Sequence, residues 1–237
     1  MTSPSEPLWC VVPAAGRSTR VGGEVPKQYL PIAGKPMLQH TLERLAAHPR
    51  IGGLMVVLAA DDRRWPGWSA LGGKPVLTAI GGAQRADSVL AGLFALRERV
   101  ADAQFILVHD AARPCIAAAD VSRLIELGVP AGGALLAAPL RDTLKRADAE
   151  RRVTTTEPRE TLWRALTPQL FRYGELRDAL RAAAAAGIEV TDEAMAMERA
   201  GRRPLLVEGA ESNIKLTTPA DLALAEFLLR NGAAAQR

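Results

Sequence analysis

The sequence predicts an α/β fold in which helices flank a mostly parallel sheet and a β-hairpin arm protrudes from it. Short apolar runs rich in β-branched residues alternate with amphipathic stretches of helical length, which is typical of βα units. The first run, Leu8 to Ala14, is apolar throughout, as in a strand covered on both faces. Two polar strand-like pieces between about residues 140 and 160 predict the arm. No repeat or linker interrupts the 237 residues, so we expect a single domain over 1–237.

The remaining elements follow in chain order. A helix at Pro36–His48 places Leu38, Leu42 and Leu45 on one face, and Pro36 suits its first position. Further strands are predicted at Leu54–Ala59, Val76–Ile80, Phe105–His109 and Gly133–Ala138. Further helices are predicted at Ala86–Arg99, Asp120–Leu127, Tyr173–Ala186 and Asp192–Ala200.

Turn and cap signals complete the layout. The arm is predicted from Asp142–Arg146 and Arg152–Thr156, which flank a turn-like segment. Gly187 and Gly201 suit the left-handed positions that end two helices. The last helix is expected to begin at Pro219 within a Thr-Pro-Ala-Asp capping box over residues 218–221.

Composition restricts the class of partner. The net charge is +4 and the pI about 9.4, but the basic residues are scattered and rarely interleaved with aromatic ones. This favours a small polyanionic substrate over nucleic acid. No apolar run is long enough to span a membrane and the N-terminus does not resemble a signal peptide, so we expect a cytoplasmic protein. Cys10 and Cys115 match no metal or redox motif and are expected to be inert thiols.

The loop after the first strand carries the clearest chemical signal. Small residues at 14–16 let backbone N–H groups approach a phosphate chain closely. Arg20 and Lys27 then supply the positive charge that a triphosphate needs when its α-phosphorus is attacked. A surface turn with solvated cations is the alternative. The spacing matches neither a Walker P-loop nor a dinucleotide fingerprint, which argues against a kinase or a dehydrogenase.

Six further motifs follow along the chain. Gly81-Gly82 could open a slot for a flat base, with Ser88 nearby as a hydrogen-bonding group. Asp110 lies at the carboxyl end of a strand, where open α/β sheets bind ligands, and Arg113 could balance its charge. The other motifs are Asp142-Thr143, the segment 162–169, Thr191-Asp192-Glu193 and Asn213-Ile214-Lys215. His109 is expected to be structural, and Thr191 is a candidate N-cap.

With these seven motifs in order, the chain closely resembles the 2-C-methyl-D-erythritol 4-phosphate cytidylyltransferases of the non-mevalonate isoprenoid pathway. The resemblance covers nearly the whole chain and implies a Rossmann-like nucleotidyltransferase fold. It implies transfer of CMP from CTP to 2-C-methyl-D-erythritol 4-phosphate, with release of pyrophosphate and catalysis by Arg20, Lys27 and Lys215. The implied CTP site comprises Pro13, Ala14, Ala15, Gly16, Gly82, Ser88 and Ala111. The implied substrate site comprises Asp110, Arg113, Thr143, Arg159, Thr167 and Thr191.

The resemblance also implies a divalent cation and a partner subunit. Mg²⁺ is expected to bridge the CTP phosphates, and Asp110 is the protein carboxylate that could contribute to its site. A homodimer is implied in which the arm brings Thr143 and Arg159 to the partner's pocket; a guanidinium suits a phosphomonoester. Two positions depart from the family: Ser18, where many relatives have glycine, and Ser212, where many have aspartate.

Two other functions remain open at this stage. A cytidylyltransferase for another polyol phosphate, such as ribitol 5-phosphate, would share the first loop, and only the pocket residues would discriminate. A non-catalytic nucleotide-binding protein is the alternative from another class. The presence of Arg20, Lys27 and Lys215 together argues against it, because a silent protein has no use for all three.

Overall fold

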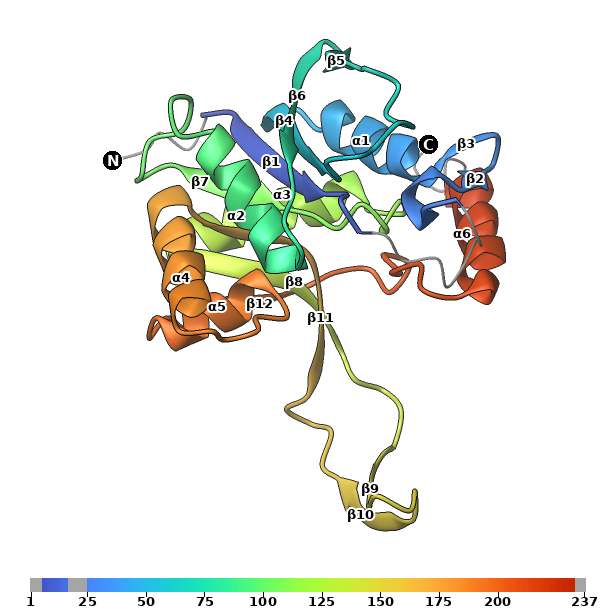
Figure 1. Cartoon of the computed structure of the whole chain (residues 1–237). Helices are drawn as coiled ribbons and strands as arrows, with labels where there is room; N and C mark the ends of the chain where they lie inside the picture. Colours follow the sequence, from blue (N-terminus) through green and yellow to red (C-terminus); the bar gives the residue numbers. More distant parts are fainter. Residues whose placement is uncertain (1–5, 17–24, 233–237) are drawn as a thin grey trace.

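A computed structural model describes residues 6–16 and 25–232 of the chain. Its centre is an eight-stranded sheet in the order β12-β8-β11-β7-β1-β4-β6-β5 (Figure 1). The strands are β1 (Leu8–Pro13), β4 (Ile51–Leu58), β5 (Ala70–Leu71), β6 (Lys74–Ile80), β7 (Phe105–Val108), β8 (Gly133–Pro139), β11 (Trp163–Arg172) and β12 (Leu205–Glu208). All pairings are parallel except those of β11 and β5, which confirms the mostly parallel sheet.

Helices cover both faces because the strand residues alternate between two apolar clusters. On one face α1 (Met37–Ala47) and α3 (Ala118–Ala131) pack over Cys10 and Val12 of β1. On the other face α2 (Arg85–Ala95), α4 (Tyr173–Ala185) and α5 (Glu193–Arg199) pack over Val11. This two-sided burial explains why β1 is apolar at every position. Both cysteines are buried, and burial raises the pKa of Cys115 to about 11.

The C-terminal helix α6 (Pro219–Gly232) lies apart from these two layers. Its buried residues pack with a third cluster that includes Ile32 and Met37. Near it lie the 3-10 turn η1 (Lys27–Tyr29) and the short pair β2 (Pro31–Ile32) and β3 (Lys35–Pro36), which the sequence analysis did not predict. Among the described residues, no helix has both the length and the apolar character needed to cross a membrane.

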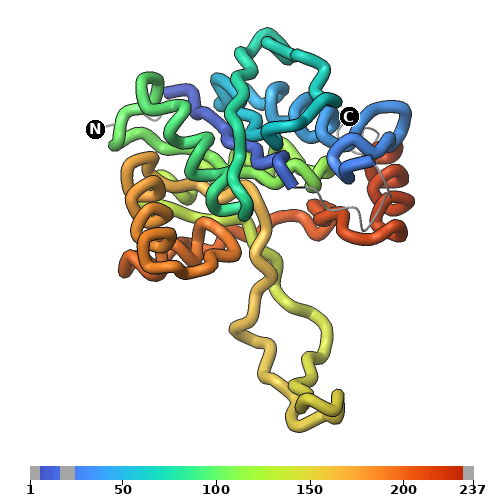
Figure 2. The backbone as a smooth tube through the Cα atoms, viewed as in Figure 1, coloured from blue at the N-terminus to red at the C-terminus, as the bar shows by residue number. Residues whose placement is uncertain are grey.

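The predicted arm is present as a long excursion from the sheet. It leaves after β8, carries the antiparallel pair β9 (Leu144–Ala147) and β10 (Val153–Glu157), and returns into β11. Figure 2 shows its tube extending well away from the body. The Leu140 N–H donates to the Leu162 carbonyl at 3.0 Å and closes its base.

Several predicted boundaries and caps need correction. Pro36 is the N-cap of α1 and not its first residue, a shift of one position. The N-cap of α5 is Asp192 and not Thr191, because the Asp192 carboxylate accepts from the Met195 N–H at 2.9 Å. Gly187 and Gly201 do have positive φ, at 65° and 77°, as predicted.

Candidate active site

A cleft of about 560 Å³ opens at the carboxyl edge of the parallel strands. Its walls come from the segments that directly follow β1, β4, β6 and β7, together with the residue Lys215 from the segment after β12. This is the edge at which open α/β sheets place their ligands. Ten predicted site residues line it: Pro13, Ala14, Ala15, Gly16, Lys27, Gly82, Ser88, Asp110, Ala111 and Lys215. Arg20 and Ser18 lie outside the described residues.

One wall of the cleft is backbone that leaves no room for side chains. A Cβ added to Gly81 would lie 2.6 Å from both Ala15 Cβ and Ser88 Oγ, and one on Gly82 would lie 2.4 Å from Asp87 Cβ. Asp87 is fixed there because its carboxylate accepts from the Gln84 N–H, 3.1 Å away, within the capping box that starts α2. The two glycines are therefore required for a flat wall of exposed peptide groups.

Two lysines reach the cleft from different parts of the chain. Lys27 is placed by η1, whose neighbouring residue Gln28 is buried and donates from Nε2 to the Ala14 carbonyl at 2.7 Å. The Lys27 ammonium donates to the Leu216 carbonyl at 3.5 Å, directly beside Lys215. The loop after β1 and the segment before α6 thus bring their cations to one place.

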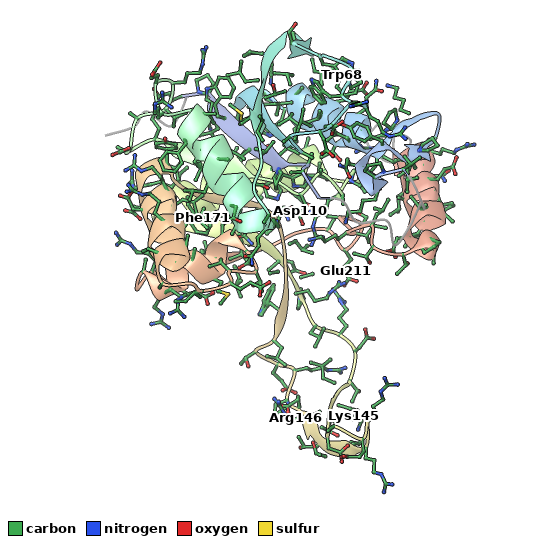
Figure 3. The ribbon with its side chains drawn as sticks, in the orientation of Figure 1. Trp68, Asp110, Lys145, Arg146, Phe171 and Glu211 are labelled. Atoms are coloured by element: carbon green, nitrogen blue, oxygen red, sulfur yellow. The ribbon has the colours of Figure 1, made fainter. Side chains whose placement is uncertain are left out.

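Asp110 lies near the middle of the molecule (Figure 3), and each of its oxygens faces at least one cation. Oδ1 is 2.9 Å from Arg85 Nε, and Oδ2 is 2.9 Å from Lys215 Nζ and 3.5 Å from Arg113 Nε. Burial alone would disfavour the charged form. The cations outweigh it, Arg85 the most, and hold the pKa of Asp110 well below its usual range.

Behind the cleft, one hydrogen-bonded chain fixes the Asp110 backbone. The Thr167 hydroxyl accepts from the Asp110 N–H at 3.1 Å, so its own hydrogen is available to His109 Nδ1 at 2.9 Å. His109 Nε2 then donates to the Arg113 carbonyl, 3.1 Å away. Burial, above all, lowers the pKa of His109 to about 4, so the ring is neutral and structural, as expected.

Five other predicted substrate residues lie away from the cleft lining. Thr167 and Arg113 are buried behind it, and the Arg113 guanidinium donates to the Asn213 carbonyl at 2.7 Å. Thr191 is exposed, and its hydroxyl donates to Met195 Sδ at 3.5 Å. Thr143 and Arg159 are exposed on the arm, where Arg159 donates to the Arg141 carbonyl.

Sequence reasoning missed one pair of buried charges. Arg85 was not among the predicted site residues, yet its guanidinium bonds both Asp110 and Glu193. Glu193 has no exposed surface. Glu193 does belong to a predicted motif, Thr191-Asp192-Glu193. However, Arg85 and Glu193 are 108 residues apart, and nothing in the sequence indicates that they form a pair.

The described residues offer no carboxylate cluster for a divalent cation. No group of three or more His, Cys, Asp or Glu in this part of the chain could hold a metal. Both oxygens of Asp110 already face Arg or Lys nitrogens, which compete with a cation for them. Ser212 is half-buried and supplies no second carboxylate. Residues 6–16 and 25–232 therefore do not form a Mg²⁺ site from protein ligands alone.

A parallel sheet, a glycine wall and converging lysines at the carboxyl edge define a nucleotidyltransferase-type enzyme. Comparison with known proteins makes this specific. Residues 8–231 match the family model for "IspD: 2-C-methyl-D-erythritol 4-phosphate cytidylyltransferase", and the chain belongs to this family.

Individual relatives agree with the family. The 2-C-methyl-D-erythritol 4-phosphate cytidylyltransferase of Xanthomonas euvesicatoria is 63% identical over 225 residues, which are 94% of this chain and 85% of that protein. A crystal structure of a 4-diphosphocytidyl-2C-methyl-D-erythritol synthase matches with a TM-score of 0.80 at 36% identity, covering 94% of this chain and 99% of that one. The Thermus thermophilus cytidylyltransferase matches with a TM-score of 0.76 at 33% identity, covering 94% and 99%. The fold, family and class of enzyme predicted from the sequence are thus confirmed.

Proposed function

We propose that the chain transfers CMP from CTP to 2-C-methyl-D-erythritol 4-phosphate in isoprenoid precursor biosynthesis. The products are 4-diphosphocytidyl-2-C-methyl-D-erythritol and pyrophosphate. The observation that carries the proposal is the convergence of Lys27 and Lys215 on one cleft that Gly81 and Gly82 also line. The proposed location is the cytoplasm, as expected from the sequence.

The reaction needs positioning and charge rather than covalent catalysis. A phosphomonoester oxygen of the acceptor is already anionic near neutral pH, so it can attack without a strong base. It forms a bond to the α-phosphorus of CTP while the bond from that phosphorus to the bridging oxygen of the β-phosphate breaks, and pyrophosphate leaves. Negative charge builds on the phosphoryl oxygens, where fixed cations stabilise it.

The residues take roles that follow from their places in the cleft. Lys27 and Lys215 stand where they can contact phosphate oxygens, and Arg20 is assigned to the same task from the sequence. CTP binding is assigned to Gly82, to Ser88 and to backbone groups of Ala14, Ala15, Gly16 and Ala111. Pro13 completes this part of the cleft lining. Mg²⁺, when bound, would neutralise triphosphate charge; its ligands in this proposal are the CTP phosphates, because the described residues offer no carboxylate cluster.

The acceptor site is proposed to be shared between two copies of the chain. Asp110 is assigned to an acceptor hydroxyl, with Arg113, Thr167 and Thr191 around it. Thr143 and Arg159 lie on the arm and do not line this chain's own cleft, so a partner's pocket is where they would act. The arm also exposes apolar surface, with Val153 63% exposed, which a partner subunit would cover.

The decisive experiment follows pyrophosphate release from CTP, Mg²⁺ and 2-C-methyl-D-erythritol 4-phosphate. Ribitol 5-phosphate and the other nucleoside triphosphates are run in parallel. Strong release only with CTP and the methylerythritol phosphate is expected. Release with ribitol phosphate instead would keep the mechanism and change the acceptor, and silence from a folded protein that still binds CTP would favour a binding module.

A further inference from the structure

Two helices that are distant in the sequence begin at the same point beside the cleft. Arg85 is the first residue of α2 and Glu193 the first residue of α5. Their side chains form a bidentate ion pair: Arg85 NH1 is 2.6 Å from Glu193 Oε1, and Arg85 NH2 is 3.1 Å from Glu193 Oε2. The remaining donor of the fork, Nε, is directed at Asp110 Oδ1, 2.9 Å away. The six atoms of these three contacts are thus held in one geometry.

The α5 start is itself anchored to the sheet. The Gln169 side chain of β11 accepts from the Ala194 N–H at 2.7 Å and donates to the Asp192 carboxylate at 3.0 Å. Gln169 is 1% exposed, so neither bond is shared with solvent. Glu193 is therefore held rigidly, and it can fix the plane of the Arg85 guanidinium.

Helix stability explains only the acidic half of this arrangement. Glu193 in the first turn of α5 suits the positive end of that helix dipole, whereas Arg85 at the start of α2 does not. A cation at a helix N-terminus is unfavourable, because that end of the helix dipole is already positive, by about 0.3–1 kcal/mol. A buried carboxylate–guanidinium pair also loses hydration that its mutual attraction only partly restores. Two apolar side chains would hold the packed helices together as well as this ion pair does. We therefore look for the role of the pair in its contact with Asp110.

We propose that Glu193 and Arg85 are positioning residues that orient the Asp110 carboxylate toward the acceptor. This rests on the proposed function, since Asp110 is the residue assigned to an acceptor hydroxyl there. With Oδ1 fixed by Arg85, Oδ2 faces Lys215 at 2.9 Å, and the pair sets where that ammonium stands in the cleft. Glu193 does not line the cleft, so it acts only through Arg85.

The test measures kcat and KM for both substrates in Glu193→Gln, which keeps the size of the side chain and the charge of Arg85. Misplacing a reacting group by about an ångström can lower the rate by about 10²-fold, so we expect kcat/KM for the polyol phosphate to fall about tenfold to a hundredfold. KM for CTP should change little. Glu175→Gln is the control, because it makes the same substitution in a more exposed Glu–Arg ion pair, with Arg202 at 3.1 Å, that does not include Asp110.

A double-mutant cycle distinguishes positioning from a separate effect of Arg85. In an Asp110→Asn background, Glu193→Gln should change kcat/KM by no more than about twofold, because its target is gone. A full effect in that background would overturn the inference. So would kcat/KM within twofold of wild type in the single variant.

A second variant covers the case in which Glu193→Gln does not fold. Arg85→Met with Glu193→Met replaces the buried pair by apolar side chains, a change that is often neutral for stability. If the pair serves only to hold the helices together, this folded double variant turns over at the wild-type rate. If it positions Asp110, turnover stays at least tenfold lower. Wild-type protein runs alongside: its failure to release pyrophosphate would instead refute the proposed function.

Discussion

Lowering the pH should destabilise the fold through one buried histidine. His109 is fully buried, and its pKa is lowered from 6.5 to about 4. The unfolded chain therefore binds a proton that the folded chain excludes. The stability that depends on the neutral ring is complete above pH 6.5 and is lost as the pH falls towards 4. Between about pH 7 and pH 5 this linkage amounts to about 2 kcal/mol of the free energy of unfolding.

The hydrogen bonds give the same sign as burial. A protonated ring would carry a hydrogen on Nδ1, facing the Thr167 hydroxyl that now donates to it. That hydroxyl already accepts from the Asp110 N–H, so it would have to turn its own hydrogen elsewhere. Asp110 does not add to the change in this range, because its lowered pKa keeps it ionised throughout.

The assay is urea unfolding at both pH values, followed by the fluorescence of the four tryptophans, for wild type and His109→Asn. His40 and His48 are present in both proteins, so their titration cancels in the comparison. We expect wild type to lose about 2 kcal/mol more than the variant on going from the higher to the lower pH. An equal loss in both proteins would refute the reasoning, whatever the absolute stabilities.

Three further outcomes follow from the site. Lys27→Ala should lower turnover by about 10²-fold or more in a steady-state pyrophosphate assay; near-normal turnover would remove this residue from the mechanism. Gly82→Ala should raise KM for CTP about tenfold or more, because its Cβ would collide with Asp87 Cβ at 2.4 Å and move the cleft wall; an unchanged KM would show that the wall adapts. Mixing Lys27→Ala with Arg159→Ala subunits, each nearly inactive alone, should restore about a quarter of wild-type activity if arms are exchanged, and none if each chain uses its own arm.

The sequence predicted most strands because their burial is uniform. Leu8–Ala14 was placed to within one residue of β1, since a strand covered on both faces is apolar at every position. β11 was missed because its environment changes along its length. Residues 163–165 are exposed at the base of the arm, whereas 166–171 are buried, and its pairing with β8 shifts between Ala165 and Gln169. Neither period 2 nor a continuous apolar run describes such a strand.

β12 was missed for a different reason. It has four residues at the edge of the sheet, and of them only Val207 is buried. A strand this short and this exposed gives too little pattern to separate it from a loop. Its position nevertheless matters for the site, because its parallel pairing with β8 directs the following segment, with Lys215, to the carboxyl edge.

The charges around Asp110 explain why a basic site contains buried acids. Among the described residues in and behind the cleft, the cations Lys27, Arg85, Arg113 and Lys215 outnumber the acids Asp110 and Glu193 by two, which favours anionic substrates. Without the acids, four cations in so small a volume would repel one another and swing into solvent. With them, Arg85, Arg113 and Lys215 are each held at a fixed distance from a carboxylate before any substrate arrives. Cations fixed in this way need little rearrangement as charge develops in the transition state, which is the condition under which electrostatic stabilisation is most effective.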